Sequence, residues 1–497
     1  MPKPAHRRVF AAALMVALAA LGAGCERKPE GAIRVVVIGD PPRFADPAQG
    51  PLSPGEAVLL QNVAQGLVRF DPRGQIEPGL AERWNVSDDG LSYIFRLASG
   101  EWPGGRRISA QHVARLLRRQ VAAASDNPLK DALGAAEIVA MTDRVLEIRL
   151  PSPRPELLQL LAQPELAIVY ERQGTGPFAI EPAEGGELSL HRDVTDPDEE
   201  QAASERLSLR GLDAQAAVGA FVAGEADLVL GGTFADLPFA RARRLPRGTL
   251  EFDPVAGLFG LVPARSTGPA ADVELRRLLA QAIDREALIA ALDVPGLLGR
   301  ATLLESGLDG IAEPIQPAWT TVPIGERRPG LIAAADELLG DATAQEGERP
   351  PIRIALPEGP GADLLLARLA QDWQLLGFRV ERAGPGAPAD FRLLDLVAPS
   401  SSPSWFLRRF RCDERPVCSE DADELLEAAR TAPVAAQRSA LQAEAARLIE
   451  EAQSFLPIAA PVRWSLVSDR IEGFAGNRFG RHTLTRLEER LAREGPR

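Results

Sequence analysis

One predicted strand is marked by large apolar side chains that alternate with Ser92 and Arg96. Residues 91–97, LSYIFRL, place a large apolar side chain at every second position. That period is typical of a half-buried strand. An aspartate turn at residues 87–90 precedes it, and a Pro-Gly-Gly turn follows. Ser109 then caps a predicted helix whose apolar positions share one face.

Apolar patterns elsewhere predict an α/β protein of several domains. Residues 33–38, IRVVVI, form a continuous apolar run, which is typical of a fully buried strand. Further strands are predicted at 144–150, 352–356 and 378–381, and a helix followed by a strand at 214–230. Single helices are predicted up to Gly66 and at 78–83, 156–161 and 364–376, and a pair of helices at each of 272–292 and 423–451. A chain of 497 residues is long enough for two or three domains.

Composition and charge exclude some partners. A hydrophobic content of 45% and a charged content of 25% are ordinary for a globular protein. The net charge of −13 argues against nucleic acid or an anionic membrane as the main partner. The four histidines are scattered, and no His/Cys cluster has metal-ligand spacing, so we expect no metal and no cofactor.

The pattern of the N-terminal residues indicates a targeting segment. A basic start is followed by an apolar run at residues 9–23, which is too short to span a bilayer comfortably. The run ends in LGAGC, which resembles a lipoprotein signal-peptidase box with Cys25 as the lipidation site. We therefore expect a signal peptide over residues 1–25 and a tether over 26–32, with the protein held at a membrane only through a lipid on Cys25. An ordinary secretory signal with an incidental cysteine is the alternative.

Five short sequence motifs follow one another between residues 65 and 113. They are QGL at 65–67, EPGLAERW at 77–84, SDDGLSYIFRL at 87–97, WPGG at 102–105 and SAQHV at 109–113. In this order they resemble the signature region of bacterial extracellular solute-binding proteins of family 5, the periplasmic receptors of peptide-type ABC importers. Two positions depart from the usual form: Pro103 precedes the glycine pair, and His112 stands where an acid is usual.

The resemblance covers nearly the whole mature chain and implies a fold. We expect a type II periplasmic-binding-protein-like clamp of two α/β lobes with an additional inserted domain. The expected limits are 33–71, 170–270 and 465–497 for lobe I, 72–169 for inserted domain II, and 271–464 for lobe III. Within lobe III, Arg276, Asp284 and Arg285 invite a catalytic interpretation, but a structural Asp–Arg ion pair that fixes lobe packing is favoured.

A two-lobe receptor binds by closing on its ligand, and an extended peptide can add to a lobe edge as a strand. In the peptide receptors that the chain resembles, an aspartate late in the last lobe binds the peptide ammonium. The matching stretch here is 390–403, in which Asp390 and Pro403 agree with the pattern but Pro399 stands in the aspartate's place. Proline has neither charge nor N–H, so the usual anchor is missing. Pro263 likewise replaces an asparagine, which would reduce backbone hydrogen bonding to a peptide.

Six residues remain as candidate ligand contacts: Glu56, Asp395, Trp405, Arg408, Arg409 and Asp413. Glu56 matches an acid at the mouth of lobe I, and Asp395 or Asp413 could take over the ammonium. Trp405 is either a stacking platform or a core aromatic. The two arginines are either anion partners or part of a solvated surface.

The two remaining cysteines, Cys412 and Cys418, lie close together in RCDERPVCS. In an oxidising periplasm, nearby cysteines more often pair than stay free, so a disulfide is the favoured interpretation. A redox role would need a CxxC-like spacing, which is absent.

The favoured function is that of a monomeric, lipid-anchored periplasmic component of an ABC importer. It would bind a peptide-like or other polar solute and present it to the permease and ATPase subunits. A divergent envelope scaffold or sensor is the alternative. A secreted hydrolase is weaker, because the chain has no Gly-x-Ser-x-Gly elbow and no HExxH. The sequence leaves open which solute is bound and which membrane holds the lipid.

Overall fold

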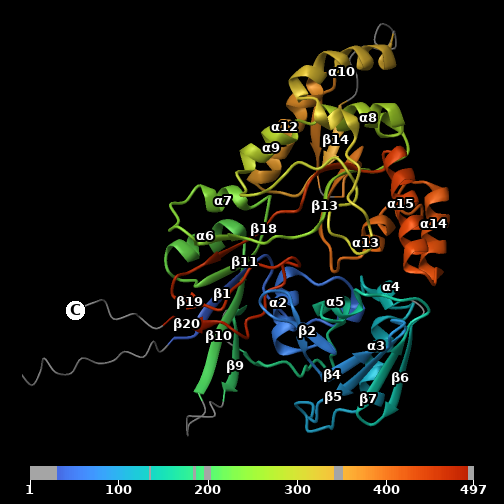
Figure 1. Ribbon diagram of the computed structural model, residues 1–497. Helices are drawn as coiled ribbons and strands as arrows, with labels where there is room; N and C mark the ends of the chain where they lie inside the picture. Colours follow the sequence, from blue (N-terminus) through green and yellow to red (C-terminus); the bar gives the residue numbers. More distant parts are fainter. Residues whose placement is uncertain are drawn as a thin grey trace, which may run out of the picture. The chain divides into compact units, whose positions relative to one another are not determined.

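A seven-stranded sheet is built around the first predicted strand. The computed structural model describes residues 31–133, 136–182, 186–194, 203–340, 351–384 and 386–490. The run at residues 33–38 is β1 (Ile33–Ile38), which pairs in parallel with a strand on either side at the middle of the sheet (Figure 1). The order is β12 (Leu250–Phe252), β18 (Arg463–Val467), β11 (Leu228–Thr233), β1, β10 (Ala203–Leu212), β9 (Leu188–Val194) and β8 (Ala179–Pro182).

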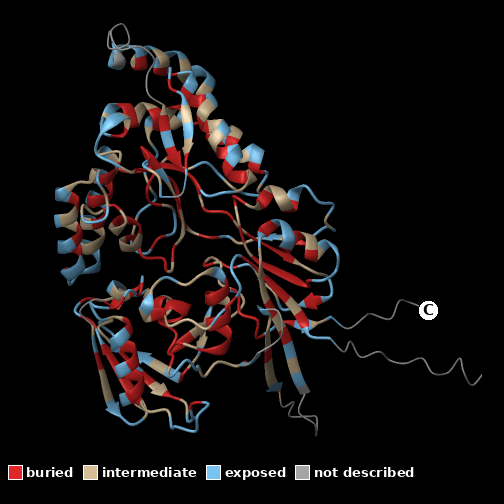
Figure 2. Ribbon diagram, turned by 180° about the vertical axis from the view of Figure 1, so that it is seen from behind, coloured by how far each residue is buried: buried red, intermediate tan, exposed pale blue. Residues whose placement is uncertain are grey.

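A five-stranded sheet forms the core of the expected lobe III. Its order is β15 (Val380–Ala383), β14 (Ile352–Ala355), β16 (Phe391–Val397), β13 (Gly257–Pro263) and β17 (Leu456–Ala459). Every residue of β13 is buried. Figure 2 shows buried residues, in red, on strands in the interior of the molecule. The predicted limits assign residues 257–263 to lobe I, whereas β13 pairs with β16 in this sheet. The lobe limits otherwise stay a prediction.

The segment 81–149 contains a four-stranded antiparallel sheet. Its order is β4 (Ala81–Val86), β5 (Ser92–Leu97), β7 (Val145–Arg149) and β6 (Glu137–Thr142). The alternating segment 91–97 becomes β5, which buries Tyr93, Phe95 and Leu97 and leaves Ile94 exposed. Helix α3 (Ala110–Gln120) packs on this sheet, and Ser109 accepts a hydrogen bond from the His112 amide as its N-cap. Two short ribbons complete the strands: β2 (Val68–Phe70) with β3 (Ile76–Pro78), and β19 (Ile471–Glu472) with β20 (Glu488–Glu489).

The predicted helix at 78–83 is wrong, because strands β3 and β4 occupy this segment. Trp84 of β4 lies opposite Phe95 of β5, so pairing with the neighbouring strand overrides local helix propensity. The helix expected to end at Gly66 is α2 (Pro54–Val63), which ends three residues earlier. A Cβ atom at Gly66 would lie 2.2 Å from the Leu161 carbonyl oxygen, so glycine permits this close backbone approach.

The remaining helices cover the sheets or extend lobe III. They are α4 (Lys130–Leu133), α5 (Leu157–Leu161), α6 (Ala214–Val222), α7 (Leu237–Arg241), α8 (Val273–Ala282), α9 (Arg285–Leu292), α10 (Ile324–Leu339), α12 (Pro360–Gln374), α13 (Pro403–Arg408), α14 (Glu420–Thr431) and α15 (Ala435–Glu451). In α8 and α9, the predicted structural ion pair between Asp284 and the two arginines is wrong. Arg276 and Arg285 donate to backbone carbonyls, and the Asp284 carboxylate lies 3.3 Å from Arg328. Burial lowers the pKa of Arg285 to about 9.

The chain crosses between the two larger sheets at two adjacent segments, 253–256 and 460–462. Arg463 lies at this crossing, and its Nη1 donates to the Asp395 carboxylate of β16 at 2.8 Å. Burial raises the pKa of Asp395, the Arg463 charge opposes the rise, and nearby Asp236 adds to it. Burial also raises the pKa of Asp236. One guanidinium therefore compensates two partly desolvated carboxylates.

A disulfide joins Cys412 and Cys418, with 5.1 Å between their Cα atoms, and closes a short loop between α13 and α14. Cys25, the leader and most of the predicted tether lie outside the described residues. Among the residues that are described, no helix combines the length and the apolar character needed to cross a bilayer.

Replacing Arg463 with methionine should destabilise the fold in a pH-dependent way. Removing one partner of a buried pair leaves an uncompensated charge, so we expect a loss of about 2 to 3 kcal/mol at pH 7. Asp395 and Asp236 have raised pKa values in the folded state, so their ionisation costs stability as the pH rises above ~4. The loss should therefore shrink toward pH 4. Urea unfolding across this range measures it.

The matched control is Arg447→Gln. Arg447 forms exposed ion pairs with Glu444 and Glu451 on α15, and such surface pairs contribute ~0–1 kcal/mol. Equal losses for the two variants, or a loss independent of pH, would contradict this role for Arg463.

Candidate functional site

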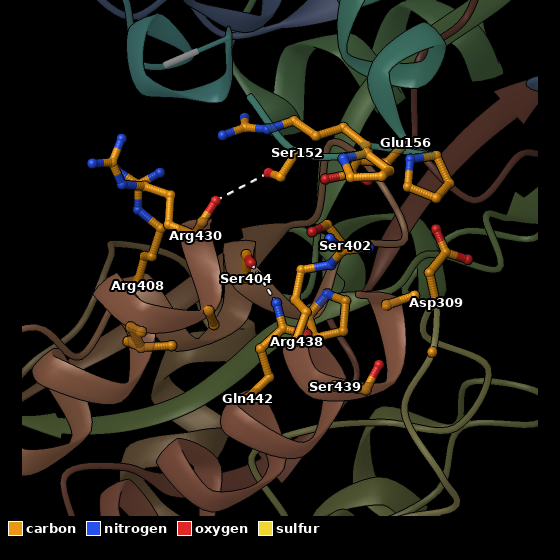
Figure 3. Close-up of a pocket in the computed structure, with 18 of the residues that line it drawn as sticks. Ser152, Glu156, Asp309, Ser402, Ser404, Arg408, Arg430, Arg438, Ser439 and Gln442 are labelled. Carbon is orange, nitrogen blue, oxygen red and sulfur yellow. Dashed lines mark hydrogen bonds between the residues drawn. The ribbon is translucent and has the colours of Figure 1, made fainter. Parts of the chain in front are cut away.

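A polar cavity of about 170 Å³ lies between the segment 152–156 and the last three helices of lobe III. The segment reads Ser-Pro-Arg-Pro-Glu and connects β7 to α5. Helices α13, α14 and α15 supply the opposite wall. In Figure 3, Ser152 and Glu156 face Arg408, Arg430 and Arg438 across the cavity.

Hydrogen bonds in and beside this cavity join the inserted domain to lobe III. Ser152 Oγ donates to the Arg430 carbonyl oxygen at 3.0 Å, which is the upper dashed line of Figure 3. The Ser401 amide donates to Gln159 Oε1 at 2.9 Å. Gln163 Nε2 donates to the Pro399 carbonyl oxygen at 2.7 Å. The structure therefore has the expected inserted domain in direct contact with lobe III.

Three of the candidate ligand residues line a second cavity of about 120 Å³ beside the first. They are Trp405, Arg408 and Arg409, and this cavity also includes Arg154 and Glu156. Trp405 is half-buried, with its ring 5.0 Å from the Phe406 ring and nearly perpendicular to it. The Arg409 guanidinium lies 5.3 Å from the centre of the Trp405 ring. Burial lowers the pKa of Arg409.

The other three candidates lie elsewhere and have partners within the protein. Asp395 bonds to Arg463 at the crossing, and the exposed carboxylate of Asp413 lies 3.6 Å from Arg411. Neither residue lines the two cavities. A ligand role for either carboxylate stays a prediction, and binding would have to displace an arginine.

Glu56 belongs to a different cavity, of about 730 Å³, lined by residues 43–46, 49–52 and 169–172 and by part of α3. Its carboxylate accepts a hydrogen bond from Arg43 Nε at 2.6 Å and closes a capping box with Ser53 at the start of α2. Burial opposes ionisation of Glu56, but the bonds from Arg43 and Ser53 prevail and lower its pKa. The structure thus does not bring Glu56 together with Trp405, Arg408 and Arg409.

The two proline departures have structural counterparts. Pro399 presents only a carbonyl oxygen, and Gln163 binds it. Pro263 ends β13, which has β16 on one side and β17 on the other. Because β13 is an inner strand, its hydrogen bonding is directed to these neighbours, and a peptide could not add to it as a further strand.

The sequence did not reveal several residues of the first cavity. Arg154 comes from a proline-rich turn, and Arg430 and Arg438 come from ordinary amphipathic helices. The one available signal was the arginine between two prolines at 153–155. Within the described residues, no group of three or more His, Cys, Asp or Glu side chains could hold a metal ion.

The chain thus has two mixed sheets joined by paired crossings, a third, antiparallel sheet and a polar cavity between domains. The family model for bacterial extracellular solute-binding proteins, family 5, matches residues 75–392. The chain belongs to this family.

Among similar proteins, di/tripeptide-binding protein 1 of Pseudomonas aeruginosa is 24% identical over 89% of this chain and 92% of its own length. The fold resembles the Escherichia coli murein tripeptide binding protein MppA, with a TM-score of 0.77 at 18% identity over 93% of this chain and 99% of that one. It also resembles Haemophilus influenzae OppA in complex with the peptide RPPGFSPFR, with a TM-score of 0.76 at 17% identity and the same coverage. The expected type II two-lobe fold is confirmed, and the first two of these proteins are named as binding proteins.

Replacing Gln159 with alanine should loosen the contact between the inserted domain and lobe III. The Ser401 amide would lose its only acceptor among the described residues, because Gln159 Oε1 is the group that it contacts. Losing a hydrogen bond of ordinary strength costs ~1 kcal/mol of stability. We therefore expect the Ser401 amide to exchange with solvent deuterium about fivefold to tenfold faster.

Gln374→Ala serves as the matched control, since Gln374 is an exposed residue at the end of α12. If Ser401 exchanges at the same rate in the Gln159 variant and the control, the contact does not hold the domains together.

Proposed function

We propose that the protein is the periplasmic solute-binding component of an ABC importer. It takes a small peptide-like or other polar solute between the inserted domain and lobe III and presents it to the permease. The observation that supports this most directly is the polar cavity of about 170 Å³ whose walls come from two domains. A site divided in this way links ligand capture to domain closure, which is the change that a permease can recognise.

The ligand class of the relatives supports a peptide-like solute. Di/tripeptide-binding protein 1 is named for such ligands, and the solved OppA contains a nonapeptide. Against a free peptide ammonium stands Pro399, whose position offers no charge. The solute would then be held chiefly by groups other than an ammonium anchor.

A second candidate function is an envelope scaffold or sensor that does not transport. The observation in its favour is that Gln163 and Gln159 already bind the backbone of residues 399 and 401. In this interpretation the inserted domain occupies the place of a ligand, and the closed arrangement is the working state.

Thermal unfolding of the full chain in a non-ionic detergent distinguishes these functions. The protein is heated with pools of di- to hexapeptides and with pools of non-peptide solutes. A ligand at a hundredfold excess over its dissociation constant adds ~2.7 kcal/mol, which raises the melting temperature by several degrees.

A shift with peptides supports the importer with a peptide ligand, and a shift with another solute alone removes only the peptide. If no pool changes the melting temperature, the importer is contradicted and the scaffold is favoured.

The lipid anchor is part of the proposal and has its own test. We expect a diacylated Cys25 to hold the protein on the envelope, facing the periplasm, because two fatty-acyl chains together give stable membrane binding. Cys25→Ser should move the protein from the membrane pellet to the soluble fraction and abolish fatty-acid labelling. Retention of the label in the variant would place the lipid elsewhere.

A further inference from the structure

Four arginines from two domains face the same cavity. Arg154 comes from the proline-rich segment of the inserted domain. Arg408, Arg430 and Arg438, which are labelled in Figure 3, come from α13, α14 and α15. They are close enough to interact: burial lowers the pKa of Arg154, and the charges of the other three lower it further. Glu156 opposes this effect. Like charges gathered in this way are stabilised by an anion between them.

The cavity carries an excess of positive charge in a chain that is otherwise acidic. Its lining contains five arginines and three carboxylates, whereas the whole chain has a net charge of −13. Arg430 already pairs with Glu427 at 2.6 Å, and Arg408 lies 3.3 Å from Asp131. Neither of these ion pairs involves Arg438.

The Arg438 guanidinium has N–H groups that can still bind a ligand. Its Nη1 donates to the Ala432 carbonyl oxygen at 3.4 Å, which is a long bond. Within the part of the chain that the structure describes, no carboxylate lies at ion-pair distance from it. Arginine binds carboxylates through two parallel N–H groups, and its planar shape makes that geometry specific.

The rest of the lining suits a carboxylate. Ser402, Ser404 and Ser439 contribute hydroxyl groups, and Gln442 Nε2 donates to Ser404 Oγ at 2.7 Å, the lower dashed line of Figure 3. Hydroxyl groups can donate to an anion. A cavity of about 170 Å³ is smaller than the ~300–1,000 Å³ typical of drug-sized ligands, so it has room for one small acid or one acidic residue.

We propose that this cavity binds a carboxylate of the solute and that the protein selects small acidic solutes. Arg438 from lobe III and Arg154 from the inserted domain contact the anion from opposite walls, so binding draws the two domains together. The proposal rests on the solute-binding function given above and names its ligand class. An acidic dipeptide and a small dicarboxylic acid share this chemistry.

Calorimetric titration of the full chain with matched acids and amides tests the selectivity. The pairs are Ala-Glu with Ala-Gln, and succinate with succinamide. We expect at least one acid to bind about tenfold or more tightly than its amide, with affinity falling as the salt concentration rises from 50 to 500 mM. Binding of Ala-Glu alone identifies a peptide, and binding of succinate identifies a simple acid.

Variants then locate the binding. Arg438→Gln should weaken binding of the acid about tenfold or more, and Arg438→Lys should restore part of it because the charge remains. Arg247→Gln is the matched control, because Arg247 is an exposed arginine of lobe I that does not line the cavity. It should bind the acid as the parent protein does.

The outcomes separate this inference from the proposed function. If amides bind as tightly as acids, or if Arg438→Gln and Arg247→Gln behave alike, the carboxylate site is overturned while solute binding stands. If no solute of either kind binds, here or in the thermal screen, both are overturned.

Discussion

The two crossings between the large sheets constrain everything else in this protein. The backbone passes from β12 to β13 and returns from β17 to β18, and Phe252 lies opposite Trp464 where the two paths meet. At this point Arg463 reaches from β18 to the Asp395 carboxylate of β16. A charge pair in a largely desolvated place is weak evidence of stability, but losing either partner alone would leave an uncompensated charge. The relative placement of lobe I and lobe III therefore depends on this junction.

The inserted domain depends on contacts of another kind. Ser152 and Gln163 donate hydrogen bonds to backbone carbonyl oxygens of lobe III, and Gln159 accepts one from the Ser401 amide. Amide and hydroxyl bonds of this kind add ~1 kcal/mol each and can open and reform. The arginines lie on both walls of the same interface, so their mutual repulsion opposes the hydrogen bonds. An anion would change that balance, which is how a ligand could favour one arrangement of the domains over another.

Much of the fold followed from local patterns. The apolar run at 33–38 became β1, the alternation at 91–97 became β5, and Ser109 caps α3. These features are local: the side-chain period and the cap are contained in a few consecutive residues. The prediction of a helix at 78–83 failed because the strand there forms only by pairing with β5, which comes later in the chain. The family could also be recognised, because short motifs in a fixed order are a property of the sequence alone.

The candidate site was only half predictable. Trp405, Arg408 and Arg409 lie together because they are neighbours on one short helix, but Glu56, Asp395 and Asp413 were grouped with them without any way to measure distance. The sequence by itself determined the strands at 33–38 and 91–97, the Ser109 cap, the family and the absence of charge at Pro399, because each depends on residue types at fixed spacing. Only the tertiary structure decided that Arg154 faces Arg438, since residues 284 positions apart meet through packing and domain contacts that no local pattern encodes.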